Sequence, residues 1–466
     1  MSPTTELNPS PSVPHSIDDL RSRCVGLVLV PGDDGYDDAA SSWNLVVRQR
    51  PAAVVVAQHS ADIAAAIAFA ASECLPIAVK GTGHGTARAA DGAILVVTER
   101  LRELRVDPVA RTARIGAGLR WADVLPAVQR HGLAPLLGSS PDVGVVGYTL
   151  GGGSGWLVRK YGFQADHVRA IELVTSDGKT VRATRTDNAD LFWALRGAGA
   201  GSFGVVTAVE IDLVPVDSVY AGNLFWPAEM AEEVTTRWSS WAPGTPTELT
   251  SAVVFMNFPP IDDVPAALRG RSFVGLRGCF VGDEATGRAL IDEWRMWKTP
   301  EVDLFHARPF GEIAAVSMDP VDPLPYRITT ESFDDVGDEV ASILAGATFP
   351  TSGPPALAFS EIRHVDGDTP RGWGALDRGR RAPFVLTVLG VPHTPDELPA
   401  LDAQLAGLHA ALAPHATGAT YLNFTDGEER LERTRSAFDP ETLRRLADLK
   451  RAIDPRGLFS HGLPLA

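Results

Sequence analysis

Two clusters of glycine in the first half of the chain restrict the folds that it can adopt. The first lies in PIAVKGTGHGTA at residues 76–87, where a single histidine, His84, stands among three glycines after an apolar run. The second carries seven glycines from Gly138 to Gly155. Backbone without Cβ atoms can approach another segment or a ligand closely, and its amides can converge on an anion. The clusters therefore indicate either tight turns in a β-rich domain or a cradle for a large, phosphate-bearing ligand.

Two common nucleotide-binding motifs do not explain these glycines. The stretch GAGSFG at 199–204 matches G-x-G-x-x-G, but a predicted helix precedes it and a predicted strand follows it, the reverse of a Rossmann fingerprint. No glycine cluster ends in G-K-S or G-K-T, so a P-loop is excluded as well.

The pattern of elements predicts a mixed α+β domain up to residue 217. Buried strands are expected at 52–57, 76–80, 92–98, 112–118 and 203–215, helices at 60–75, 121–132 and 190–197, and a hairpin at 167–184 with an Asp177-Gly178 turn. Ser60 is the expected cap of its helix, with Asp62 in the first turn, and Gly132 closes the helix at 121–132.

The composition and the pattern of predicted elements change after Pro215. Residues 218–415 contain fewer glycine clusters, more proline turns, and strands separated by longer amphipathic helices, which predicts a second domain. The tail, 416–466, is expected to form a strand and then a helix that ends before Asp454-Pro455. A chain of 466 residues is long enough for two domains.

Composition narrows the class of partner and the compartment. A net charge of −16 argues against nucleic acid, but it allows a phosphorylated cofactor bound by backbone amides. Residues 1–20 are polar and proline-rich without an apolar core, so we expect disorder there and no secretion signal. No stretch is long enough to span a membrane, and three cysteines cannot make a disulfide framework, which favours a cytoplasmic protein. No ligand spacing predicts a metal site.

Four motifs together carry a resemblance to a known family. VKGTGHGTARAADGAILV, GSSPDVGVVGYTLGGGSGWLVRKYGFQADHV, DLFWALRGAGAGSFGVVT and the C-terminal YLNF…LKRAIDPRGLF follow one another in this order. They resemble the berberine-bridge-enzyme-like FAD-linked oxidases of the vanillyl-alcohol-oxidase/PCMH flavoprotein class. The first three cover most of residues 50–217 and the fourth covers the tail, whereas the middle of the chain matches only in outline.

The resemblance implies a PCMH-type FAD-binding domain in two pieces, residues 1–217 and 416–466, around a substrate domain at 218–415 with an antiparallel sheet backed by helices. In the family the histidine of the first loop bonds covalently to the 8α carbon of FAD, the position of His84 here. Many members make a second link through a cysteine where this chain has Ser140, and a hydroxyl lacks the nucleophilicity of a thiolate. A single covalent link is therefore expected. The residues implied to contact FAD are Lys80, Gly81, Thr82, Gly83, His84, Gly85, Gly138, Ser139, Ser140, Val143, Gly144, Gly147, Tyr148, Gly151, Gly152, Gly153, Gly155, Val205, Val206, Tyr421 and Asn423.

The same resemblance suggests the chemistry. Val143 resembles the small oxygen-gate residue of true oxidases, which favours molecular oxygen as electron acceptor. Tyr421, in a Y-x-N strand expected to reach the flavin, is the first candidate for a general base if a neighbour lowers its pKa, and Glu361 and His364 come second. Arg363 could instead be a structural pair for a carboxylate.

The expected function is an FAD-dependent oxidase that takes a hydride from a small alcohol, amine or polycyclic natural product and reduces O2 to H2O2. The alternatives are a carbohydrate oxidase, against which Ser140 counts, and a non-redox cyclase, isomerase or silent binding protein of the same fold. The substrate, the stereochemistry and the oligomeric state, a homodimer included, stay open.

Overall fold

The computed structural model describes residues 16–351, 355–367, 374–392 and 394–465. The first sheet has four strands in the order β1-β2-β4-β3, with β2, β3 and β4 parallel and β1 antiparallel to β2. Its inner strands, β2 and β4, are fully buried runs of aliphatic residues, as parallel strands covered on both faces require. The strands are β1 (Leu27–Leu29), β2 (Ala53–Val56), β3 (Ile77–Lys80) and β4 (Ile94–Val97).

The second sheet has five antiparallel strands in the order β5-β6-β9-β7-β8. The expected hairpin forms between β7 and β8, and Gly178 takes a positive φ of 77° in its turn. The strands are β5 (Leu104–Asp107), β6 (Thr112–Gly116), β7 (Val168–Val174), β8 (Thr180–Ala183) and β9 (Val205–Asp212).

The third sheet has eight antiparallel strands, all from residues 218–390. Its main path is β13-β10-β12-β11-β16-β17-β15, and β14 pairs with β10. The strands are β10 (Ser218–Pro227), β11 (Leu249–Asn257), β12 (Ser272–Phe280), β13 (Val302–Asp303), β14 (His306–Pro309), β15 (Arg327–Phe333), β16 (Leu357–His364) and β17 (Phe384–Gly390).

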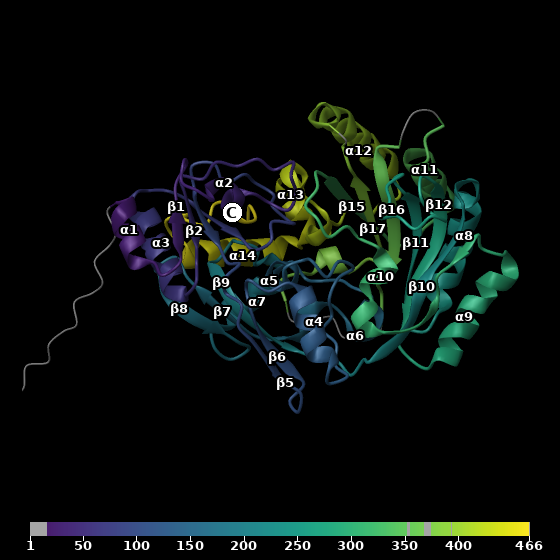
Figure 1. Ribbon diagram of the computed structural model, residues 1–466, viewed down its shortest axis with the longest axis horizontal. Helices are drawn as coiled ribbons and strands as arrows, with labels where there is room; N and C mark the ends of the chain where they lie inside the picture. The colour runs from purple at the N-terminus through teal and green to yellow at the C-terminus, as the bar shows by residue number, and fades with distance from the viewer. Residues whose placement is uncertain (1–15, 352–354, 368–373, 393, 466) are drawn as a thin grey trace, which may run out of the picture.

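Helices cover one face of the eight-stranded sheet, and Figure 1 shows them along its outer side. Aliphatic and aromatic side chains of α8, α9, α11 and α12 pack there in one buried cluster with the sheet. This arrangement confirms the predicted antiparallel sheet backed by helices and the mixed α+β class. The α-helices are α1 (Ile17–Arg23), α2 (Tyr36–Ala40), α3 (Ser60–Ser72), α4 (Trp121–Gln129), α5 (Val145–Leu150), α6 (Val158–Tyr161), α7 (Ala189–Ala198), α8 (Ala231–Trp241), α9 (Glu284–Trp297), α10 (Ala314–Ser317), α11 (Asp338–Thr348), α12 (Leu398–Leu412), α13 (Gly427–Arg433) and α14 (Pro440–Ile453).

The other face of the eight-stranded sheet points toward the first part of the chain. Ala221, Ala252 and Cys279, on three of its strands, belong to the same buried cluster as the core of the five-stranded sheet. The tail also returns to the first part: the Ile77 amide donates to the Leu458 carbonyl at 2.7 Å, and the yellow C-terminal segment lies beside the purple and blue elements in Figure 1.

Three expectations about local structure are wrong. Helix α3 is capped by His59, not Ser60, because the Asp62 carboxylate accepts the amides of Gln58 and His59. Residues 17–20 belong to α1, whose N-cap is Ser16, so the expected disorder does not extend through residue 20; residues 1–15 lie outside the described part.

The third error concerns the tail, where the Y-x-N segment is not a strand. Tyr421 is extended, but Leu422–Phe424 form a 3-10 turn closed by the Phe424 amide on the Tyr421 carbonyl at 3.0 Å. The helix expected before Asp454 is present as α14.

Candidate functional site

The first glycine loop follows β3 directly, and hydrogen bonds from side chains fix both the end of β3 and the loop backbone. Buried Lys80 donates from Nζ to the carbonyls of Ala39 and Ser41, at 2.7 and 2.5 Å. Burial lowers the pKa of Lys80 to about 8. Tyr326 donates its hydroxyl to the His84 carbonyl, and Arg430 donates to the Gly85 carbonyl at 2.9 Å.

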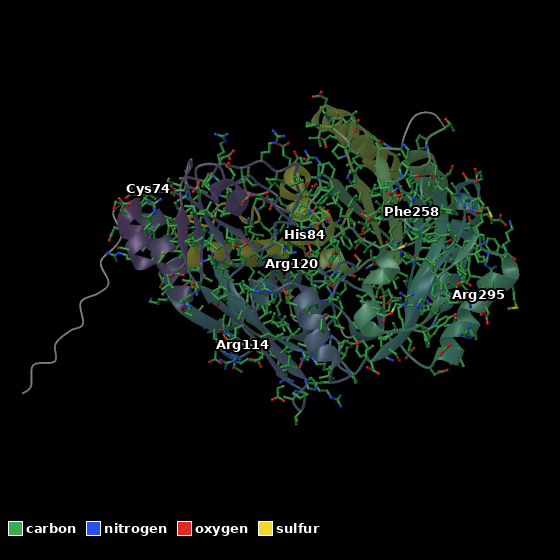
Figure 2. All side chains as sticks on the ribbon, viewed as in Figure 1. Cys74, His84, Arg114, Arg120, Phe258 and Arg295 are labelled. Carbon is green, nitrogen blue, oxygen red and sulfur yellow. The ribbon has the colours of Figure 1, made fainter. Side chains whose placement is uncertain are left out.

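His84 is held on two sides. Its ring stacks on Trp43 with centroids 4.2 Å apart, and its Nε2 lies 3.4 Å from Oδ2 of Asp142. Asp142 is itself paired with Arg120, and Figure 2 shows His84 and Arg120 near the middle of the molecule. Burial lowers the pKa of His84 to about 4, despite the opposing effect of Asp142. The imidazole is therefore neutral at pH 7, and the hydrogen bond from Nε2–H to Asp142 leaves Nδ1 as the nitrogen with a free lone pair.

Most glycines of the second cluster are required by the protein's own packing. A Cβ on Gly151 would lie 1.7 Å from Oδ1 of Asn423, and one on Gly155 would lie 1.8 Å from the Leu137 carbonyl oxygen. A Cβ on Gly153 would meet the ring of Tyr148 at 2.6 Å. These positions support the turn interpretation of the cluster.

Two glycines have no such explanation. A Cβ on Gly147, in α5, would have no atom within 4 Å, and one on Gly81 would be 3.9 Å from its nearest neighbour. Gly147 is exposed although it stands beside the buried residues Val145 and Val146. Bare backbone facing open space is what a bound ligand would use, so these residues fit a cofactor such as FAD.

The other residues implied to contact FAD are spread around these loops. The Asp142 amide donates to the half-buried Ser140 hydroxyl at 3.3 Å, and a Cβ on Gly144 would touch the Thr82 side chain at 3.3 Å. Val143 packs on the core beside them. Val205 and Val206, in strand β9, lie deeper, because the side chain of each packs in a buried hydrophobic cluster.

Tyr421 lies against the second glycine cluster. Its side chain is 1% exposed and packs with Phe163, Phe424 and Leu376, and its hydroxyl makes no hydrogen bond of normal geometry to a described residue. A Cβ on Gly152 would be 3.8 Å from that hydroxyl. The neighbouring Asn423 donates from Nδ2 to the Tyr148 carbonyl at 3.0 Å, which fixes the segment on the cluster.

The electrostatics of Tyr421 are mixed. Burial raises its pKa, whereas the amides of Ser154 and Gly153 and the guanidinium groups of Arg363 and Arg380 oppose that rise. Arg363 is a cationic neighbour of the kind that a phenolate needs, but it does not outweigh burial, so the expected lowering of the Tyr421 pKa is not seen.

Glu361 faces the same interface from the eight-stranded sheet, between two arginines. Arg277 on β12 donates from Nη1 to its Oε2 at 2.8 Å, and Arg363 donates to its Oε1 from Nη2 at 2.6 Å. Burial alone would raise the pKa of Glu361, but Arg363 and Arg277 outweigh it and lower the pKa. The carboxylate is therefore ionised.

His364 lies on the opposite face of β16, so the structure does not bring it together with Glu361. Side chains alternate along a strand, and Glu361 and His364 are three residues apart. His364 packs on Phe384 with ring centroids 5.1 Å apart, on the side of the helices, and Phe384 packs in turn on Trp238 of α8. Burial and Arg159 lower the pKa of His364 to about 3.

Three further residues, not predicted from the sequence, belong to the site. Asp142 stands two residues after Ser140 in the same motif, and its acidic side chain beside a predicted anion site was the signal that could have identified it. Trp43 and Arg277 come from distant parts of the chain, and no local pattern marks them.

Among the described residues, no group of three or more histidine, cysteine, aspartate or glutamate residues could hold a metal ion. Within the same residues, no helix has both the length and the apolar character needed to cross a membrane.

Comparisons with known proteins agree with this geometry. Residues 51–184 match the family model of an FAD binding domain. The chain is 34% identical over 210 residues to (R)-6-hydroxynicotine oxidase of Paenarthrobacter nicotinovorans, covering 44% of this chain and 46% of that protein. An FAD-linked oxidoreductase of Dictyostelium discoideum is 24% identical over 94% of this chain and 93% of its own. Apart from such full-length matches, the chain spans about half the length of the first curated relatives.

Solved structures show the fold over nearly the whole chain. The 6-hydroxy-D-nicotine oxidase of Arthrobacter nicotinovorans aligns with a TM-score of 0.83 at 24% identity, covering 95% of this chain and 98% of the other. A BBE-like protein of Physcomitrella patens aligns with a TM-score of 0.84 at 20% identity, covering 97% and 99%. These matches show an FAD binding domain in this chain, relatives that are FAD-linked oxidoreductases, and a fold shared over nearly the whole chain with 6-hydroxy-D-nicotine oxidase and a BBE-like protein.

Proposed function

We propose that this protein is an FAD-dependent oxidase that removes a hydride and a proton from a small organic substrate. FAD, when bound, supplies the hydride acceptor and passes two electrons to O2, which gives H2O2. The observation that carries the proposal is that neutral His84 lies on the first glycine loop and Tyr421 packs against the second glycine cluster, while the two glycine segments touch each other where Gly144 meets Thr82.

His84 would hold the cofactor through one covalent bond. Its neutral ring has the lone pair that such a bond needs, and Asp142 fixes the tautomer that leaves Nδ1 free. The Asp142 carboxylate would also stabilise the positive charge that the ring gains when Nδ1 forms a bond. Ser140, at the position of the second link in many members, supports a single attachment.

Tyr421 would accept the substrate proton at its phenolic oxygen. Burial raises the pKa of Tyr421, and Arg363 and the amides of Ser154 and Gly153 only partly oppose that rise, so we propose that bound substrate and FAD complete the stabilisation of the phenolate that this step requires. Glu361 is the second candidate, but its pairing with two arginines lowers its basicity. His364 is not proposed as a base, because it packs on Phe384 on the side of the sheet that the helices cover.

The proposal also includes O2 as the electron acceptor and a cytoplasmic location. Val143, small and half-buried within the second cluster, would leave room for O2 to approach the cofactor. A reducing, cytoplasmic setting agrees with Cys24, Cys74 and Cys279, which are all free thiols.

An anaerobic screen tests the proposed activity. Purified protein that carries its flavin should be bleached at its visible absorption band by a substrate of the correct class, and admission of air should restore the band with one H2O2 formed per substrate consumed. Bleaching that oxygen does not reverse would indicate a dehydrogenase. Conversion of a substrate without bleaching or H2O2 would indicate a non-redox enzyme.

A further inference from the structure

The face of the eight-stranded sheet that meets Tyr421 carries more positive than negative charge. One carboxylate, Glu361, is shared by Arg277 and Arg363, and the three side chains are at most 5% exposed. Burying unequal charge is costly unless a further group compensates it. If the substrate supplies this compensating group, the charge of the site indicates what chemical group the substrate carries.

Arg277 does not need a further partner. It donates from Nε to Oδ1 of Asn223 at 2.8 Å, from Nη1 to Glu361 at 2.8 Å, and from Nη2 to the Ser317 carbonyl at 3.2 Å. These bonds hold its guanidinium in the sheet and make it a structural residue.

Arg363 is different, because one of its nitrogens has no acceptor. Its Nε and Nη2 both donate to the same Glu361 oxygen, at 3.0 and 2.6 Å. Its Nη1 is buried and makes no hydrogen bond to a described residue. The guanidinium lies 4.1 Å from the centroid of Trp156, which contributes attraction to the charge but accepts no bond in the plane of the group. A buried donor without an acceptor is rare and costly in a folded protein.

The other titratable groups that the structure describes around Arg363 do not accept a hydrogen bond from its Nη1. Asp319 is the second carboxyl near the pair, and burial raises its pKa, against the opposing effects of Arg277, Ser139 and Arg363. Arg380 is committed to Asp166 through two bonds at 2.9 and 2.6 Å. Tyr148 and Tyr421 also interact with Arg363, and burial raises the pKa of both phenols.

We propose that the substrate carries an anionic oxygen, as a carboxylate or an ionised phenol or enol, and that Arg363 Nη1 binds it beside Tyr421. The inference rests on the proposed function, because it places the substrate at the same interface. An organic acid would supply the missing acceptor for Nη1 and would place a negative charge beside Arg363. An ammonium group would place a further cation beside Arg363 and would offer no acceptor to Nη1, so simple amines should be poor substrates.

Binding of matched probes to the flavin-loaded protein tests the inference. Benzoate and benzamide have nearly the same shape and differ in charge, and benzylammonium has the opposite charge. Calorimetric titration should show benzoate binding roughly tenfold or more tighter than benzamide, since a hydrogen bond to a charged group contributes that much. Benzylammonium should bind more weakly than either.

Substitutions of Arg363 and Glu361 should change benzoate affinity in opposite directions. Arg363→Met should remove the preference for benzoate, whereas Glu361→Gln should strengthen benzoate binding because it deletes the competing carboxylate. Arg169→Met is the matched control, since Arg169 is half-exposed and pairs with Asp212 on the five-stranded sheet. It should leave all three affinities unchanged.

The results separate this inference from the proposed function. Loss of flavin from the wild-type protein would count against the proposed function alone. A flavin-loaded protein that binds benzamide or benzylammonium as tightly as benzoate overturns the inference, and so does one in which none of the three probes binds at millimolar concentration. A benzoate preference that survives Arg363→Met overturns it too.

Discussion

His84 can act as a nucleophile only while its ring is neutral, and two features of its surroundings keep it so. Burial beneath Trp43 disfavours the imidazolium, and the nearby Arg120 adds to that effect. Asp142 acts against burial and Arg120, because its carboxylate favours the imidazolium. This is expected of a residue that orients the His84 ring and stabilises the positive charge that the ring gains when it forms a bond. The pKa of about 4 means that the ring stays neutral throughout the range in which the protein is expected to work.

Substitution of Tyr421 tests the proposed base. Tyr421→Phe removes only the hydroxyl, which makes no hydrogen bond of normal geometry to a described residue, so the flavin spectrum should be kept. Flavin reduction by substrate should slow roughly a hundredfold, the usual size of a general-base contribution, while reoxidation by O2 stays nearly unchanged. Stopped-flow measurement of the two half-reactions checks this.

The pH dependence of the same step separates a base from a packing residue. The limb of the pH–rate profile that reports the base should flatten in Tyr421→Phe and move to higher pH in Arg363→Met, because loss of the cation disfavours the phenolate. Reduction at the wild-type rate in Tyr421→Phe would transfer the role to Glu361.

At the scale of elements, strand parity decides which side chains share a site. Glu361 and Arg363 alternate with Ile362 and His364 along β16, so only the first two face the glycine-rich segments. Sequence alone could have separated Glu361 from His364, because three residues along a strand always change the face. It could not have shown that Arg277 pairs with Glu361, 84 residues away, since that contact depends on the order β12-β11-β16 in the sheet.

Local pattern predicted seven strands and three helices between residues 50 and 217, and the last helix of the tail, because buried aliphatic runs and the turn residues between them determine these elements locally. It failed at Tyr421 and Asn423, where the extended residue is followed by a turn instead of a strand. The side chain of Asn423 bonds to the Tyr148 carbonyl, 275 residues earlier, and the segment pairs with no strand in the described part. A tertiary contact therefore replaces the local preference.

Two glycines form a matched test of what the second cluster does. Gly151→Ala should destabilise the fold, because its Cβ would overlap Asn423. Gly147→Ala should leave the flavin-free protein as stable as before or more so, since alanine favours a helix by about 1 kcal/mol and nothing occupies that space. Its flavin content should nevertheless fall if this backbone faces FAD. Melting temperature and flavin absorbance per protein measure the two effects, and full flavin content in Gly147→Ala would remove α5 from the cofactor site.

At the scale of the whole molecule, a cluster of ionisable groups joins the eight-stranded sheet to the tail. His409 of α12 bonds through Nδ1 to Glu331 of β15 at 2.6 Å and lies through Nε2 3.2 Å from Glu429 of α13. Arg433 pairs with both carboxylates. Burial alone would lower the pKa of His409, but the hydrogen bonds to Glu331 and Glu429 outweigh it and raise the pKa to about 9.

This cluster predicts a loss of stability at mildly alkaline pH. The folded state binds the His409 proton more tightly than the unfolded state, so its contribution is complete below pH 6.5 and disappears as pH rises from 6.5 through 9. The change should be on the order of 1 kcal/mol after allowance for solvent screening. Melting temperatures across pH 6–10 should show the decline in the wild type, and His409→Gln should flatten it. Equal slopes in the two proteins would contradict the assignment.

We propose that residues 1–217 and 416–466 form one FAD-binding domain around the substrate domain at 218–415. Hydrogen exchange of the flavin-free His84→Ala protein, with and without added FAD, tests this division. FAD should protect amides in the loop after β3, in residues 138–155 and in the tail near Tyr421, and should leave α8, α9 and α11 unchanged. Protection of those outer helices, or none in the tail, would contradict the division.

The covalent bond at His84 is the central claim, and one measurement tests it directly. The wild-type protein is precipitated with acid, the flavin absorbance of pellet and supernatant is recorded, and the pellet is digested for peptide mass analysis. The account predicts a yellow pellet, with FAD on the peptide that contains His84, and a His84→Ala protein that releases its FAD or purifies without colour. A wild-type protein that leaves all of its flavin in the supernatant would contradict the claim.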